Sequence, residues 1–411
     1  MLYQNLYLEN AKETSDIRVE NGIFKEIASH LEPLPGEDCV DMGGKLALPP
    51  FIESHVHLDA CLTAGDPVWN MSGTLFEGIE CWAKRKDKLT KEDVRQRVEK
   101  VLRMYAVNGI QHIRTHVDVT DPKLTAMEAL IELREEKKDV MDIQIVAFPQ
   151  EGIESYPNGR QLMIDAVKMG ADVVGAIPHF EFTREYSVSS LNFAMELAAK
   201  YDKLVDVHCD EIDDEASRGL ETLAARAYEM NMGEKVTASH TTAMHSYNNA
   251  YVQRLMRLLV MSGINFVSNP LVNTHLQGRL DNYPKRRGIT RVKELLAAGC
   301  NVSFGHDDIF DPWYPMGNGS LRDVVFMGLH VCQMMGYEEI LNSYKLISTN
   351  AARTLHLGEA YGLAEGKPAD FIVLDAKDYY EALITDAPVL LNVKGGKKIA
   401  ESVPGTKKAL F

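Results

Sequence analysis

The stretch PPFIESHVHLD, residues 49–59, holds the end of a short β-rich run and carries two histidines, His55 and His57, separated by one residue. From Leu46 onward, similar short β-rich runs alternate with longer segments of helical periodicity. That alternation is typical of parallel βα units. The predicted strands, enough to close an eight-stranded barrel, are Leu46–His57, Ile110–Val117, Ile143–Phe148, Val173–Ile177, Leu204–His208, Val236–His240, Ile264–Val267 and Val302–Phe304.

Amphipathic helices are predicted between these strands, because apolar residues recur there at three- and four-residue spacing. The clearest are Lys91–Val107, Lys123–Lys137, Ser190–Tyr201 and Ala250–Ser262.

The two ends of the chain hold short segments of hairpin type, each too small to bury a core alone. The expected segments are Leu2–Leu8, Ile17–Val19, Gly22–Ile27, Asp370–Leu374, Val389–Val393 and Lys397–Ile399. The predicted fold is therefore α/β: a TIM-like (β/α)8 barrel over residues 49–357, beside a small β-sandwich built from residues 1–48 and 358–411.

Charge and composition limit the possible partners. The chain of 411 residues has 44 Lys plus Arg against 59 Asp plus Glu, a formal charge of -15. Such a field repels polyanions, which argues against nucleic acid and acidic membranes as partners. With neither a signal-peptide pattern nor an apolar run of membrane-spanning length, the protein is expected to be cytoplasmic. The six cysteines form no C-x-x-C pair and are expected to be reduced and mostly buried.

Polar residues gather at the predicted carboxyl ends of four strands, the face on which barrel enzymes place their sites. His55 and His57 share one face of the first strand, since side chains alternate along a strand. His208 and Glu211 lie at the end of the fifth strand, His240 ends the sixth, and Asp307 and Asp308 follow the eighth.

Imidazole and carboxylate ligands of this kind suit a borderline divalent ion such as zinc or iron. Such an ion can lower the pKa of a bound water to about 7. A carboxylate that is not a ligand must then move protons, and Glu211 is close enough to share the pocket. The residues therefore predict metal-assisted hydrolysis.

The sequence resembles the amidohydrolase superfamily and, within it, the bacterial cytosine deaminases. The resemblance extends over essentially the whole chain. It is carried by residues 49–59, FPQEG at 148–152, VHCDE at 207–211, GHDD at 305–308, SGTLFEG at 72–78 and DPWYP at 311–315.

The resemblance implies roles for individual residues. One metal ion, Fe(II) or Zn(II), would be bound by His55, His57, His208 and Asp307. Glu211 would shuttle protons, and His240, with Asp307, would position and assist the attacking hydroxide. Gln150 would bind the amide edge of a pyrimidine. The ring pocket would be shaped by Phe148, Trp313 and Asp308, with Leu75 near its mouth.

The activity so implied is hydrolytic deamination of free cytosine to uracil and ammonia by a homo-oligomer, with a hexamer as one form. Other possible substrates are 5-methylcytosine, isocytosine and isoguanine. Residues 177–181 at the end of the fourth strand offer no bridging lysine, which favours one metal over two. Hydrolysis of a cyclic amide would better suit a binuclear site. A non-catalytic metal- or ligand-binding barrel is the alternative of another class. His116 and His179 could line the pocket or be structural.

Overall fold

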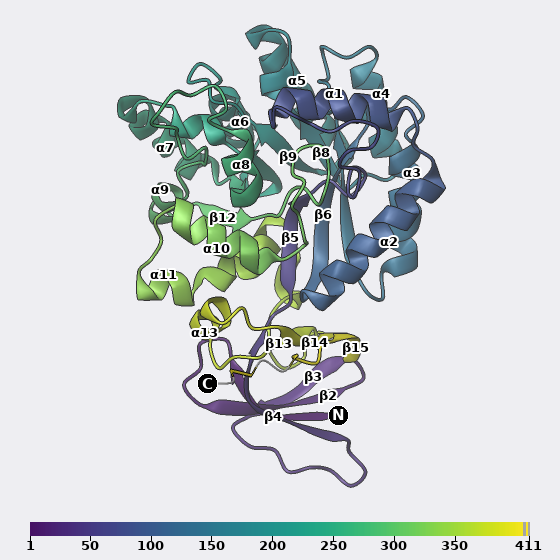
Figure 1. The fold of residues 1–411 in the computed structure, drawn as a ribbon, viewed down its shortest axis with the longest axis vertical. Coiled ribbons are helices and arrows are strands. Elements are labelled where there is room, and N and C mark those ends of the chain that lie inside the picture. Colours follow the sequence, from purple (N-terminus) through teal and green to yellow (C-terminus); the bar gives the residue numbers. More distant parts are fainter. Residues whose placement is uncertain (406–407, 410–411) are drawn as a thin grey trace.

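The computed structural model describes residues 1–405 and 408–409. It contains an eight-stranded parallel sheet and a seven-stranded mixed sheet (Figure 1). No helix among the described residues is both long and apolar enough to cross a bilayer.

The eight-stranded sheet curls into the predicted barrel. Its strands follow one another in chain order from β5 to β12, and a bridge between Val56 and Asp307 brings the two end strands together. All nine residues of β6 are buried, as expected where helices cover a parallel sheet. The strands are β5 (Phe51–Val56), β6 (Ile110–Asp118), β7 (Asp142–Phe148), β8 (Val173–Ala176), β9 (Leu204–Cys209), β10 (Val236–His240), β11 (Asn265–Ser268) and β12 (Asn301–Phe304).

The predicted first strand, Leu46–His57, is wrong at its amino end. Residues 39–48 form β4 (Cys39–Leu48), which belongs to the other sheet, and β5 begins only at Phe51. Pro49 and Pro50 lie between them. Proline has no N–H to donate to a strand ladder, so this pair ends one strand and the chain passes into the barrel.

Three of the four predicted helices begin within two residues of their predicted positions. Thr90 caps α2, its side chain accepting from the Asp93 N–H, which explains the start at Lys91. The helix expected at Ser190–Tyr201 starts earlier, because Thr183 caps it. The helices are α1 (Leu75–Lys86), α2 (Lys91–Val107), α3 (Thr125–Lys137), α4 (Gly159–Met169), α5 (Arg184–Tyr201), α6 (Gly219–Glu229), α7 (Asn249–Ser262), α8 (Pro270–Leu276), α9 (Val292–Ala297), α10 (Leu321–Val331), α11 (Tyr337–Leu341), α12 (Thr349–Thr354) and α13 (Tyr379–Ile384).

The chain ends combine in one sheet of order β15-β14-β13-β4-β1-β2-β3, which lies at the end of the barrel opposite α1 (Figure 1). The sheet folds back on itself: Phe24 on β3 packs 5.9 Å from Phe371 on β13, although three strands separate them in the order. The predicted sandwich is thus one continuous sheet. Its remaining strands are β1 (Leu2–Leu8), β2 (Thr14–Glu20), β3 (Ile23–Ala28), β13 (Phe371–Leu374), β14 (Val389–Lys394) and β15 (Lys397–Glu401).

Candidate active site

The seam that closes the barrel also positions three of the candidate metal ligands. Asp307, just past β12, donates its N–H to the carbonyl of His55 at 2.8 Å, and His57 donates its N–H to the carbonyl of Asp307 at 3.0 Å. Asp307 has a φ of 72°, an uncommon left-handed conformation outside glycine. Backbone pairing therefore fixes these residues against one another before any ligand is present.

The side chains of the four predicted ligands converge. The Nε2 atoms of His55 and His57 lie 3.4 and 3.5 Å from Oδ1 of Asp307. His57 Nε2 is 3.0 Å from Nε2 of His208, which comes from β9 on the opposite side of the barrel. Ligand atoms of His55, His208 and His240 also lie within 4.8 Å of one another.

The chemistry of this donor set fits a divalent cation. Burial lowers the pKa of His57 to about 3, and it lowers the pKa values of His55 and His208 well below the usual value. These imidazoles are therefore neutral, the form that binds metal. His55 Nε2 is buried and has no hydrogen-bond partner in residues 1–405 or 408–409. A cation between these nitrogens and Asp307 would provide the missing interaction.

Two further groups of side chains come within metal-binding reach of one another. They are His55, His116 and Asp206, and Glu211, His240 and Asp307.

Glu211 and His240 lie beside the four residues. His240 Nδ1 is 3.3 Å from Glu211 Oε1 and 3.8 Å from Asp307 Oδ2. Burial raises the pKa of both carboxyl groups, and for Asp307 the nearby Glu211 raises it further. Two carboxyl groups buried so close together favour a shared proton or a bound cation. The arrangement can hold a positive ion and keep a proton-accepting carboxyl beside it.

The predicted pocket residues surround the cluster. The ring of Phe148 stacks on His208 with centroids 3.9 Å apart. Trp313 lies 6.1 Å from the His57 ring and shares an apolar cluster with Leu75. Phe148 and Trp313 thus lie against the predicted metal-ligand histidines, while Leu75 belongs to the apolar cluster that contains Trp313.

Two polar residues complete the predicted set. Gln150 follows β7 and is only 4 % exposed; its backbone N–H lies 3.4 Å from Asp118 Oδ1. Asp308 is 3 % exposed, and burial, together with the carboxyl groups of Asp307 and Asp311, raises its pKa well above the usual value. Both are therefore buried polar groups at the carboxyl end of the barrel.

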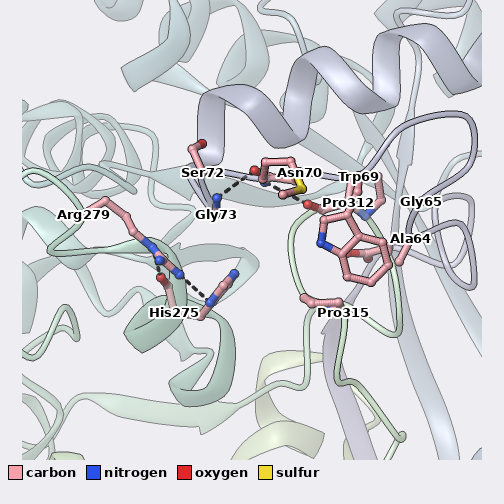
Figure 2. Close-up of a pocket in the computed structure, with 12 residues that line it drawn as sticks. Ala64, Gly65, Trp69, Asn70, Ser72, Gly73, His275, Arg279, Pro312 and Pro315 are labelled. Atoms are coloured by element: carbon pink, nitrogen blue, oxygen red, sulfur yellow. Dashed lines mark hydrogen bonds between the residues drawn. The ribbon is translucent and has the colours of Figure 1, made fainter.

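A pocket flanks the segment that carries Trp313 (Figure 2). Asn70 donates to the carbonyl of Pro312 at 3.0 Å, tying the loop before α1 to this segment. On the other wall, Arg279 NH2 lies 2.6 Å from His275 Nδ1. Asp311, which also lines the pocket, accepts the N–H of Trp313 at 2.9 Å. The contacts of Asn70 and Asp311 fix the backbone of the segment that carries Trp313.

His179 and His116 take up different positions. His179 Nδ1 accepts the backbone N–H of Glu211 at 3.3 Å, so it supports the loop that carries Glu211. His116 is fully buried, and its ring lies 3.9 Å from that of His55.

Sequence reasoning missed several residues that contact the cluster. Asn273 on α8 donates to His240 Nδ1 at 3.0 Å and lies 3.5 Å from Glu211 Oε1. Ser239 lies 3.0 Å from His55 Nδ1. Asp206 could have been found, because it precedes His208 by two residues and so shares its strand face. No spacing pattern pointed to Asn273 or Ser239.

Comparisons with known proteins agree with this geometry. A model of the amidohydrolase family matches residues 38–400. The crystal structure of 5-methylcytosine deaminase from Klebsiella pneumoniae with bound 5-fluorocytosine is 52% identical, covers 100% of this chain and 99% of its own, and superposes with a TM-score of 0.97.

More distant relatives have related activities. N-isopropylammelide isopropyl amidohydrolase from Pseudomonas sp. (strain ADP) is 29% identical over 98% of this chain and 97% of its own. Pterin deaminase from Rhizobium rhizogenes is 26% identical over 95% of this chain and 89% of its own. The family match and the 52% identical structure together show that the chain belongs to the amidohydrolase family.

Proposed function

We propose that this protein is a metal-dependent deaminase of the cytosine-deaminase kind and that its preferred substrate is 5-methylcytosine. The observation that carries the proposal is the 52% identity, over the whole chain, to a 5-methylcytosine deaminase. The sequence had favoured cytosine, with 5-methylcytosine as an alternative. The similarity supports that alternative better than the first choice.

The proposed metal ligands are His55, His57, His208 and Asp307. Their converging nitrogen and oxygen atoms suit Fe(II) or Zn(II). One ion is proposed, since residues 177–181 at the end of β8 include no lysine to bridge a second. A divalent ion held there would lower the pKa of a water toward 7, so that hydroxide is available at neutral pH.

Side chains of the protein would then transfer the protons that the reaction requires. Water oxygen bonds to C4 of the ring, the C4–amino bond breaks, and the products are thymine and ammonia. Glu211 is proposed to take a proton from the water and deliver it to the ring nitrogen beside C4. His240, whose Nδ1 lies 3.3 Å from Glu211 Oε1 and 3.8 Å from Asp307 Oδ2, would hold the water in line together with Asp307. Because attack destroys the aromaticity of the ring, protonating the ring nitrogen lowers the barrier most.

The pocket residues are proposed to recognise the ring. Gln150 offers both a donor and an acceptor to its amide-like edge, and Asp308 is a second buried polar group. Trp313, Leu75 and the apolar residues packed with them offer a surface on which a ring methyl group could be buried. This wall supports a preference for the methylated base.

The test compares ammonia release from 5-methylcytosine, cytosine, isocytosine and isoguanine, and isopropylamine release from N-isopropylammelide, with metal content measured on the same preparation. One methyl group is worth about 10- to 200-fold in kcat/KM, so 5-methylcytosine should exceed cytosine by a factor in that range. An equal or higher kcat/KM for cytosine would contradict the proposal that 5-methylcytosine is the preferred substrate. Absence of ammonia from every aminopyrimidine, with metal bound, would favour the non-catalytic barrel.

A further inference from the structure

A chain of buried polar side chains runs through the barrel interior to His55, and it begins at Arg114 on β6. Arg114 is 0 % exposed, yet its guanidinium is well satisfied. It donates from Nε to Gln144 at 2.6 Å, from NH1 to Asp206 at 2.9 Å and Thr237 at 3.1 Å, and from NH2 to the Thr354 carbonyl at 2.8 Å. A charge buried this deeply is retained only where it is paired and hydrogen-bonded.

The second half of the chain joins Arg114 to the metal ligand. Asp206 uses Oδ2 for Arg114 and Oδ1 to accept the hydroxyl of Ser239 at 2.6 Å. The same hydroxyl oxygen lies 3.0 Å from Nδ1 of His55. Ser239 has a single hydrogen to donate, and the short contact to the carboxylate uses it. Toward His55, Ser239 can only accept.

The direction of these bonds determines the tautomer of His55. Because Ser239 accepts, Nδ1 of His55 carries the proton, and Nε2 keeps its lone pair. Nε2 is the atom that lies 3.4 Å from Asp307 and lacks a partner among the described residues. We propose that Arg114, Asp206 and Ser239 act together as positioning residues that hold His55 in the tautomer and orientation needed for binding the metal.

The packing around His55 limits other ring positions. The His116 ring lies 3.9 Å from the His55 ring at an interplanar angle of 33°. His116 Nε2 is 3.9 Å from Asp206 Oδ2, too far for a hydrogen bond, and Arg114 already donates to that oxygen. The His116 ring thus packs against the His55 ring, while the hydroxyl of Ser239 orients the His55 ring.

This inference rests on the metal site of the proposed function, although not on its substrate. The main test is Ser239→Ala, in which Nδ1 of His55 loses its acceptor. Loss of such an outer contact typically weakens metal binding by about 10- to 100-fold. The affinity of the purified, metal-reconstituted protein for Zn²⁺ is measured by competition with a chromophoric chelator, and thermal melting confirms that each variant is folded.

A matched control is Ser303→Ala on β12. Ser303 is also fully buried in the barrel, but its hydroxyl lies 3.4 Å from the Phe266 carbonyl and 3.2 Å from the Thr354 hydroxyl rather than next to a histidine. It should keep the wild-type Zn²⁺ affinity. An equal loss of affinity in both serine variants would overturn the inference, because the effect would then follow from any buried cavity.

A double-mutant cycle tests whether the residues act as a unit. Asp206→Asn and Ser239→Ala interrupt the same chain, so the double variant should bind Zn²⁺ no more weakly than the weaker single variant. Fully multiplicative losses would show two independent effects and contradict the proposal. If Ser239→Ala binds Zn²⁺ like the wild type, the positioning role is wrong and the metal site stands. If the wild type itself binds no Zn²⁺, the metal site of the proposed function fails and the positioning role with it.

Discussion

The carboxyl end of the barrel and the sheet formed by the chain ends differ in which side chains they bury and in where residues with positive φ lie. In the sheet, aromatic rings fill the core, with Tyr3 packed edge-on against Phe371 at 5.1 Å, and positive φ angles occur at exposed residues such as Asn5. At the barrel end, His240 and Asp307 are buried at 1 and 2 % exposure and both have positive φ.

The two regions also differ in how their charged side chains are paired. Arg18 on β2 of the sheet pairs with Glu37 at 3.0 Å, whereas Glu211 and Asp307 are buried together without a paired Lys or Arg side chain in the described residues. Strained backbone and uncompensated carboxyl groups destabilise a fold, and they are retained where they serve a function. We therefore infer that the core of the sheet stabilises the fold, whereas the buried carboxyl groups and strained backbone at the barrel end destabilise it and are retained for function.

The largest effect is expected when a proposed metal ligand is removed. His208→Ala should lose bound metal and turnover together, by more than the roughly 10- to 100-fold typical of outer-contact changes. Metal analysis beside an ammonia assay measures both. The control is His30→Ala in the sheet region, where the side chain is 66% exposed and no effect is expected. Stoichiometric metal in His208→Ala would remove His208 from the ligand set.

Glu211→Gln separates proton transfer from metal binding. The amide keeps the shape of the side chain but cannot carry a proton, so turnover should fall by about 100- to 10,000-fold while metal is retained. Glu26→Gln in the sheet, with 46% of its side chain exposed, should turn over normally. A Glu211→Gln protein that holds metal and works at near wild-type rate would end the proton-shuttle role.

Phe371→Ala tests the other side of the comparison. The ring is fully buried between Tyr3 and Phe24, so truncation should lower the free energy of unfolding by about 3–5 kcal/mol, measured by denaturant titration. Metal content and kcat of the folded fraction should not change. A fall in either would show that the sheet and the site are energetically coupled.

The smallest expected effect concerns pH. Hydrogen bonds from Arg18 lower the pKa of Glu37 in the folded protein. The stabilisation is therefore present above the unfolded pKa of about 4.3 and is lost as pH falls through the lower, folded value. The difference in Tm between wild type and Glu37→Gln should shrink as pH drops below about 4.3. A difference that grows on acidification would contradict the pairing.

The sequence allowed the barrel and the cluster to be predicted because both depend on local patterns. Seven of the eight predicted strands lie within one residue of those observed, since alternation and burial mark them. The amino end of the predicted strand Leu46–His57 was wrong, because periodicity cannot show which sheet an apolar run joins. Pro49 and Pro50 could have indicated that one strand ends there and another begins. His55 and His57 were expected to lie together because they share a strand face, whereas the proposed set of four ligands came from the family resemblance.

The contacts around the ligands were not predictable in the same way. Asn273 reaches His240 from α8, and Ser239 on β10 reaches His55 on β5, a strand with which β10 does not pair. Such contacts depend on how helices and strands pack in three dimensions, and hydroxyl and amide groups occur at many positions without a role. The left-handed conformation of Asp307, at the seam where the barrel closes, likewise leaves no signature in the sequence.

Residues from three barrel strands are proposed to bind one cation. The most direct test is a crystal structure of the Zn²⁺-loaded protein with anomalous data at the zinc edge. We expect one peak, about 2.0–2.2 Å from Nε2 of His55, His57 and His208 and from a carboxylate oxygen of Asp307. A peak bound by His55, His116 and Asp206 instead, or none near Asp307 at saturating Zn²⁺, would contradict it.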